Sequence, residues 1–141
     1  LTEYPALTSV NLSYCPGLGD DVGGVLKECL MLEHINLSCS SKLRDEVTLE
    51  LVKCPALMSV VFSQCYNFTD EAARILGTCP LLTSVVFIQC HNLTYNAARA
   101  FAGNPTLEVI DFTNCENMTD EAVQALEMCP ALHTVSFRDC K

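Results

Sequence analysis

Residues 54–78 read Cys-Pro-Ala-Leu-Met-Ser-Val-Val-Phe-Ser-Gln-Cys-Tyr-Asn-Phe-Thr-Asp-Glu-Ala-Ala-Arg-Ile-Leu-Gly-Thr, and this stretch decides the fold because its pattern returns every 25 residues. Positions 25 residues apart are called a column below. One column holds Tyr4, Cys29, Cys54, Cys79, Asn104 and Cys129, and another holds Cys15, Ser40, Cys65, Cys90, Cys115 and Cys140. No insertion or deletion interrupts either column. A fixed period of this length predicts a solenoid, in which each repeat buries its apolar side against its neighbours.

Each repeat predicts one short strand and one helix. Within residues 54–78, Pro55 ends the preceding helix, and Val60 and Phe62 alternate at a spacing of two, which indicates a strand. The Thr-Asp-Glu triplet at 69–71 is typical of a helix start. The chain therefore predicts an α/β fold, a right-handed solenoid with six parallel strands about 4.8 Å apart and five helices. Because a helical layer is wider than a strand layer, we expect a horseshoe with concave strands and convex helices.

The pattern Cys-Pro-x-Leu-x-x-Val-x-Phe-x-x-Cys-x-Asn-Phe-Thr-Asp-Glu-Ala resembles the cysteine-containing class of leucine-rich repeats, which are ribonuclease-inhibitor-like and occur in F-box proteins. The resemblance covers residues 1–141, taken as one domain of about five and a half repeats. The departures leave every spacing unchanged, and they are Ser40 and Asn104 in place of Cys, Leu30 in place of Pro, Arg44-Asp45 in place of Thr-Asp, and Thr94-Tyr95. Leu1 falls in a mid-helix column, so we expect a fragment of a longer protein.

Ten cysteines allow three interpretations: disulfides, a metal site, or small buried apolar side chains. Side chains of one column run parallel, which disfavours disulfides, and the spacings lack the Cys-x-x-Cys pairs typical of zinc sites. We therefore expect buried free thiols, no metal and no cofactor. Free thiols indicate a reducing compartment, the cytoplasm or the nucleus. Cys39 lies outside both columns, and we expect it near the surface.

The composition of the chain argues against two classes of partner, nucleic acids and membranes. The formal net charge of −9 argues against nucleic acid, and no apolar run is long enough to cross a membrane. Eight of the 17 acids open the predicted helices, where a carboxylate favours the helix dipole. Neither His34 nor His133 has an acid or nucleophile fixed opposite by spacing, and His91 follows Cys90, whose side chain should be buried, so we expect no enzyme activity. Five Asn-x-Ser/Thr triplets, at Asn11, Asn36, Asn67, Asn92 and Asn117, are interpreted as structural rather than glycosylated.

A binding site is expected on the strand face, where outward side chains are free to vary. Most are small and polar, but one group in the middle is apolar, and it consists of Val61, Val86, Ile88 and Val109. The adjoining turns carry Tyr66, His91, Gln64 and Gln89. An apolar patch with a polar and aromatic rim is typical of a protein-binding surface, although valine and isoleucine also favour strands for their own sake.

Three functions remain open. The first is a protein-interaction module or scaffold that binds a protein partner on the concave face. The second is implied by the resemblance: the substrate-recognition domain of an F-box-type ubiquitin ligase, which requires an F-box that the chain does not show. The third is a structural element that associates end to end, because neither the first nor the last repeat, ending at Leu1 and Lys141, shows a polar cap.

Overall fold

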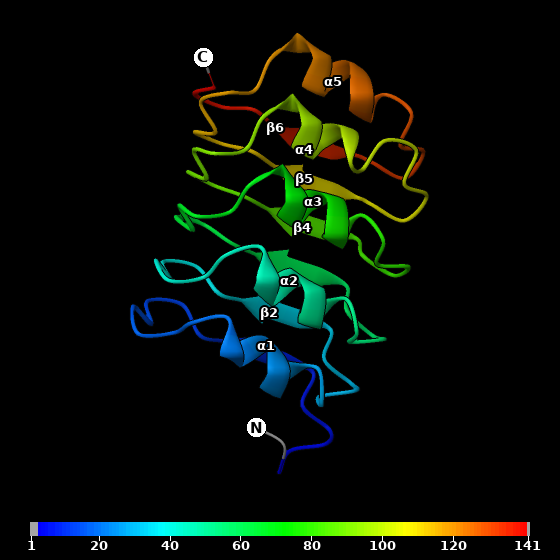
Figure 1. Ribbon diagram of the computed structural model, residues 1–141. Helices are drawn as coiled ribbons and strands as arrows, with labels where there is room; N and C mark the ends of the chain where they lie inside the picture. Colours follow the sequence, from blue (N-terminus) through cyan, green and yellow to red (C-terminus); the bar gives the residue numbers. More distant parts are fainter. Residues whose placement is uncertain (1–2, 141) are drawn as a thin grey trace.

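A computed structural model describes residues 3–140, and within them strands and helices alternate from one end of the chain to the other (Figure 1). Leu1 and Lys141, on which the expected uncapped ends depend, lie outside the described residues. The elements are β1 (Ser9–Asn11), α1 (Asp21–Leu26), β2 (His34–Asn36), α2 (Glu46–Leu51), β3 (Ser59–Val61), α3 (Asp70–Leu76), β4 (Ser84–Val86), α4 (Tyr95–Arg99), β5 (Val109–Asp111), α5 (Asp120–Leu126) and β6 (Thr134–Ser136). The six strands and five helices expected from the repeat are confirmed.

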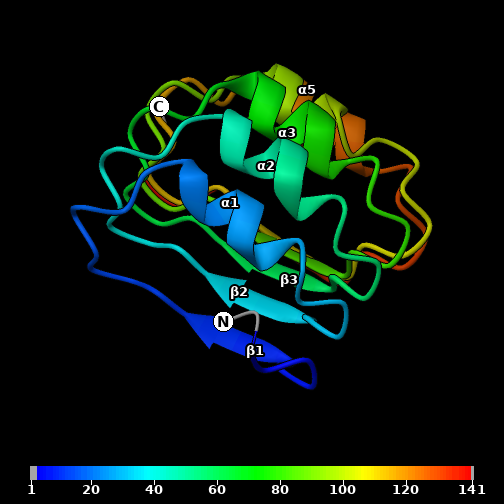
Figure 2. The same ribbon diagram turned by 60° about the horizontal axis from the view of Figure 1, so that its bottom comes forward.

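The strands form one open parallel sheet in the order β1-β2-β3-β4-β5-β6. Each strand is offset from the next by one repeat, as in the pairing of Val60 with Val85. The helices form a second layer on one side of this sheet (Figure 2). Backbone bonding continues past each three-residue strand, since the Phe62 N–H donates to the Val86 carbonyl at 2.8 Å. The predicted α/β solenoid is therefore the observed fold.

The core lies between the two layers and is made of the inward columns. Its centre is a row of rings in which Phe62, Phe87, Phe112 and Phe137 stack at centroid distances of 5.8, 5.8 and 5.7 Å. In the repeat before Phe62, the same column holds a leucine, Leu37, which is fully buried. Each ring thus packs on its equivalent in the neighbouring repeat, so burial is shared by repeats and no repeat has a core of its own.

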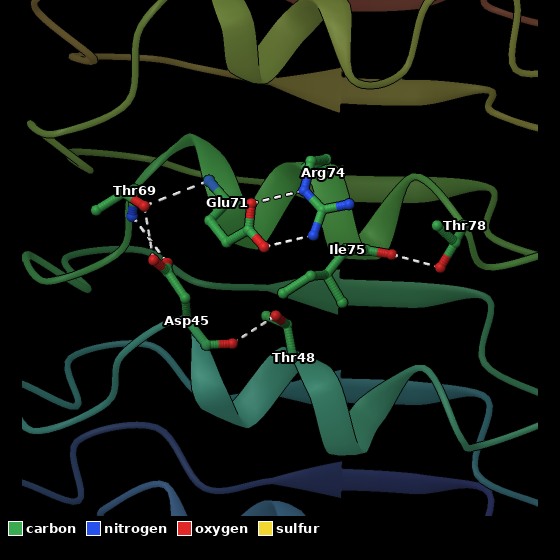
Figure 3. A network of polar contacts seen from close by, with 7 residues as sticks. All are labelled: Asp45, Thr48, Thr69, Glu71, Arg74, Ile75 and Thr78. Carbon is green, nitrogen blue, oxygen red and sulfur yellow. Dashed lines mark hydrogen bonds and ion pairs between the residues drawn. The ribbon is translucent and has the colours of Figure 1, made fainter.

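The acids that open the helices also join the repeats. The Asp45 carboxylate accepts from the Thr69 N–H at 2.9 Å and from the Thr69 hydroxyl at 2.6 Å (Figure 3). Thr69 in turn caps α3 by accepting from the Glu71 N–H. Asp70 makes the same pair of bonds to Thr94. The expected helix-dipole role is therefore incomplete, because this column also binds the N-cap of the following repeat.

The fourth repeat breaks this series. Tyr95 stands where the other repeats have aspartate, and Thr119 instead donates to Glu121 of its own helix. Helix α4 has five residues, whereas α3 and α5 have seven. At the same place the chain comes unusually close to α3: a Cβ added to Gly77 would lie 2.5 Å from the Ala100 carbonyl oxygen. A glycine at position 77 is what permits this approach.

Candidate functional site

The predicted apolar patch, here Val61, Val86, Ile88 and Val109, lies on the outward side of the sheet, and all four side chains are half-buried. Val61 and Val86 are direct neighbours in the register of β3 and β4. Val109 is not in direct register with the others, because its partner in β4 is Ser84, while Val86 faces Asp111. The patch therefore has a continuous part, Val61 and Val86 with Ile88 beyond β4, and a diagonal part at Val109. A diagonal neighbour lies about 7–8 Å away.

The strand face is hollowed beside this patch. A shallow depression of about 190 Å³ lies over the first three strands. Its outward lining is Ser9, Asn11, His34, Asn36, Ser59 and Val61. Most of these groups are small and polar, so the face changes from a polar hollow at its N-terminal end to an apolar surface at its middle.

The turn after each strand has a conformation that the sequence did not predict. Its column has φ between 56° and 60° in all six repeats, and it consists of Tyr14, Cys39, Gln64, Gln89, Asn114 and Asp139. This left-handed conformation is rare for residues other than glycine. In the first five of these repeats, the N–H of this residue still bonds to the next repeat, as Gln64 does to the Ile88 carbonyl at 2.7 Å. The six turns are therefore held in one repeated shape, and a single sequence column that contains no glycine gave no signal of it.

Gln64 and Gln89 point along this column toward each other. The Gln64 amide donates to Gln89 Oε1 at 2.7 Å, and Gln64 Oε1 accepts from the Cys39 thiol at 3.4 Å. Both glutamines are half-buried. Their first role in the structure is thus to link three repeats. Cys39, expected near the surface, is also half-buried.

Two residues after Gln64 and Gln89, Tyr66 and His91 form a stacked pair. Their ring centroids are 5.6 Å apart and the ring planes differ by 2°. Both are exposed, Tyr66 to 45%. The backbone under each ring is fixed from the following repeat, because the Asn92 amide donates to the Tyr66 carbonyl and the Asn117 amide to the His91 carbonyl, each at 2.7 Å. The two rings form a rigid flat surface beside the strand face.

The asparagines of the Asn-x-Ser/Thr triplets have structural roles, as predicted, but of two kinds. Asn92 and Asn117, with Asn67, bind the preceding repeat. Asn11 and Asn36 end their strands by accepting from the backbone N–H two residues on, at 3.0 and 2.9 Å. The first kind therefore joins repeats, and the second acts within its own turn.

The buried cysteines act as hydrogen-bond donors as well as small apolar groups. All ten are free, and seven are buried. The Cys90 thiol donates to the Phe62 carbonyl at 2.9 Å and the Cys115 thiol to the Phe87 carbonyl at 2.8 Å, each 28 residues back. Burial raises the pKa of Cys54, Cys65 and Cys79 to about 11. Such thiols stay protonated at neutral pH, which suits a structural donor and not a nucleophile.

Two of the three histidines, His34 and His133, lie near acids that the sequence did not assign to them. His133 Nε2 is 3.7 Å from Glu108 Oε2, one repeat away, and His34 Nε2 is 3.8 Å from Glu33 Oε2. All four side chains are well exposed. Between residues 3 and 140, no group of three or more His, Cys, Asp or Glu side chains is arranged to hold a metal ion. The helices in that part of the chain also lack the length and apolar character needed to cross a bilayer.

Comparison with known proteins agrees with this geometry. The family profile for the leucine-rich repeat matches residues 103–126. The chain is also similar to a chain in the crystal structure of the Rad7 and Elc1 complex in yeast, with a TM-score of 0.63 and 18% identity over 84% of this chain. It covers 32% of that chain, about a third of its length. No curated protein sequence matches it. The chain folds as a leucine-rich repeat solenoid.

Within this leucine-rich repeat fold, the predicted site residues divide into two groups. The strand-face group is Val61, Val86, Ile88 and Val109, and the turn group is Tyr66, His91, Gln64 and Gln89. Strand register joins Val61 and Val86 of the first group. Ring stacking joins Tyr66 and His91 of the second, and a hydrogen bond between side-chain amides joins Gln64 and Gln89. One further outward residue was not singled out from the sequence: Asp111, the register neighbour of Val86. Its signal was available, because the two positions are 25 residues apart in one column.

Proposed function

We propose that this leucine-rich repeat solenoid is a protein-interaction module that binds an extended or helical segment of a partner protein along its strand face. The observation that supports this most is the apolar patch next to the stacked Tyr66–His91 pair, on a face whose other side chains are mostly small and polar. An apolar centre with an aromatic and polar rim fits a protein partner.

The rigidity of the surface supports the same proposal. Tyr66 and His91 stand on backbone that is bonded to the next repeat. The patch itself stands on a sheet whose ladder continues past each strand. A surface that is ordered before binding loses little conformational entropy when a partner docks. The likeness to a chain of the Rad7 and Elc1 complex agrees with a role in a protein assembly.

The test is a pair of substitutions that charge the patch. Val61→Lys with Val86→Lys places two ammonium groups at its centre, where partner apolar groups would be desolvated. We expect an unchanged far-UV circular dichroism spectrum, because both side chains point outward, and loss of binding to a partner identified by crosslinking to the wild-type chain. Leu49→Lys is the matched control, since Leu49 is 49% exposed on the helix side. Partner binding by the double variant at wild-type affinity would refute the proposal.

Finer roles rest on the sequence resemblance. The substrate-recognition domain of an F-box-type ubiquitin ligase is the more specific form of this function, and it predicts that the full-length protein copurifies with the ligase core. The buried free thiols favour a reducing compartment, cytoplasm or nucleus, and labelled full-length protein in a secretory compartment would contradict this. We infer a binding role and no catalysis, because the buried thiols are protonated and hydrogen-bonded to backbone.

End-to-end self-association has a separate basis. Val135 in β6 is 44% exposed, whereas its column neighbours Ile110 and Val85 are fully buried. The last described repeat therefore presents apolar core residues at one end of the stack. Sedimentation across a hundredfold dilution tests this role, which predicts dissociation, while a monomer at all concentrations would exclude it.

A further inference from the structure

We propose that Asp111 makes the strand face select partner segments in which a lysine or arginine lies next to the apolar anchor. This inference rests on the proposed function and specifies its partner: a segment with a large apolar residue for the patch and a basic residue for Asp111.

The position of Asp111 places a charge at the edge of the apolar patch. It ends β5 and is the direct register neighbour of Val86 in β4. It also lies two residues beyond Val109, on the same side of the sheet, since side chains alternate along a strand. Adjacent parallel strands are about 4.8 Å apart. When an apolar side chain of the partner packs on Val86, the neighbouring residue of the partner therefore lies within reach of the Asp111 carboxylate.

Among outward positions, this acid stands alone. The outward columns are Ser9, His34, Ser59, Ser84, Val109 and Thr134; Asn11, Asn36, Val61, Val86, Asp111 and Ser136; and Ser13, Ser38, Ser63, Ile88, Thr113 and Arg138. Asp111 is the one carboxylate in the set, and Arg138 is the one side chain that is always cationic. No residue between 3 and 140 forms an ion pair with Asp111. Its charge is therefore available to a partner.

The fold itself needs the oxygen at this position but not the charge. Asp111 Oδ1 accepts from the Thr113 N–H at 2.7 Å. In the first two repeats, Asn11 and Asn36 make the same bond to Ser13 and Ser38 at 3.0 and 2.9 Å. An asparagine thus does the structural work of this column without a net charge. The second carboxylate oxygen of Asp111 is an addition that the turn does not use.

The surroundings of Asp111 strengthen the interaction that its carboxylate can make with a basic group of a partner. Asp111 is half-buried, and a partner lying on Val86 would remove more water from it. Charge-assisted hydrogen bonds are shorter and stronger than neutral ones, and screening falls as water is excluded. Glu108, an acid of the same repeat, is more exposed and lies 3.7 Å from His133. Asp111 is therefore the acid in position to bind a basic residue of the partner beside the patch.

The test uses a phage-displayed library of random dodecapeptides, selected on the immobilised full chain. We expect the wild-type chain to enrich peptides with a large apolar residue next to Lys or Arg. Asp111→Asn, which preserves the acceptor for Thr113, should keep the apolar preference and lose the basic one. The tightest wild-type peptide, made synthetically, should bind this variant about fivefold more weakly, the upper range for a partly exposed ion pair.

Two further variants separate the explanations. Asp111→Asn with Asn11→Asp restores the wild-type net charge on β1, two strands away from Val61 and four from Asp111, and it should behave like Asp111→Asn alone. If it behaves like wild type, overall charge and not Asp111 selects the peptides, and the inference is wrong. An unchanged basic preference in Asp111→Asn would also overturn it while leaving the proposed function intact. Val86→Lys should lose both preferences; if it selects the wild-type peptides, or if the wild-type chain enriches none, the proposed function fails as well.

Discussion

Gly77→Ala should destabilise the solenoid, although alanine is the better helix residue. Gly77 ends α3 with φ −59° and ψ −15°, values that any residue adopts. Alanine at such a position normally stabilises a protein by about 0.4–1 kcal/mol, because it restricts the unfolded chain. Here the new Cβ would lie 2.5 Å from the Ala100 carbonyl oxygen, whereas ordinary contact begins at 3.4 Å. The neighbouring backbone would have to move by about 0.9 Å.

The steric effect should win. Overpacking of a tight site costs about 1–3 kcal/mol, and a backbone oxygen has no rotamer by which to move away. We therefore expect a net loss of about 1–2 kcal/mol in the free energy of unfolding, after the gain from the unfolded chain is subtracted. Urea titration followed by far-UV circular dichroism measures this difference.

A matched control lies in the first helix. A Cβ added to Gly24 meets no atom within 4 Å, so Gly24→Ala should stabilise α1 by about 0.5–1 kcal/mol through helix propensity alone. Its neighbour Gly23 is the intermediate case, since its Cβ would lie 2.8 Å from Glu50 Cβ. If Gly77→Ala is as stable as the wild-type chain, the close approach of α4 to α3 does not limit this position and the reasoning is refuted.

Four smaller predictions test the bonds between repeats. Asp70→Ala should lower the free energy of unfolding by about 1–2 kcal/mol, because it removes two bonds to the N-cap Thr94; a loss below the error of a urea titration would show that these bonds contribute nothing. Ser40→Cys should raise it by about 1 kcal/mol, since the buried Ser40 hydroxyl has no partner within residues 3–140. Tyr14→Gly should raise it by a similar amount, because Tyr14 is exposed at φ 59°; thermal melting would check both. Burial raises the pKa of Cys65 from 9.0 to about 11, so its contribution is complete below pH 9 and is lost as the pH rises toward 11. Cys65→Ser should therefore reduce the fall in stability between about pH 8 and pH 10 by about 1 kcal/mol.

The sequence predicted the parts of the fold that depend on burial. A constant period assigns Val60, Val85 and Ile110 to one inward column, and all three are fully buried. It also fixed the strand register, because neighbours in a solenoid of constant period are equivalent residues. Burial of the column and strand register can both be predicted without knowing which polar groups form hydrogen bonds with each other. The buried free thiols followed from the same argument.

The bonds between repeats could not be read in this way. Asp70 binds a residue 24 positions on, Asn92 one 26 positions back, and Cys90 one 28 positions back. These separations differ from the 25-residue period because each side chain reaches a different distance along the neighbouring repeat. The period of the sequence does not specify that distance. The left-handed turn at Gln64 was missed for a related reason. Its conformation is imposed by bonding to the next repeat and not by a residue that prefers it.

At the candidate site the limit was different. Val61, Val86 and Ile88 were identified because they are apolar in columns that are otherwise polar. Asp111 was not singled out because it and Glu108 are two carboxylates on one repeat, and two carboxylates without a pocket are usually only solvated. What gives it significance is a comparison within the chain: Asn36 ends β2 with the same backbone bond and no charge.

The separation of structural and variable positions explains how such a chain can acquire a partner without loss of fold. The inward columns and the bonds between repeats stabilise the stack, and a substitution at one of these positions removes contacts from two neighbouring repeats. Apolar outward positions such as Val86 make no hydrogen bonds through their side chains, yet they stand on a backbone that the bonds between repeats hold rigid. A change from Asn to Asp in this setting alters recognition by one charge and leaves the turn intact. The same physical arrangement that makes the repeats interchangeable in the core therefore makes them individually adjustable on the strand face.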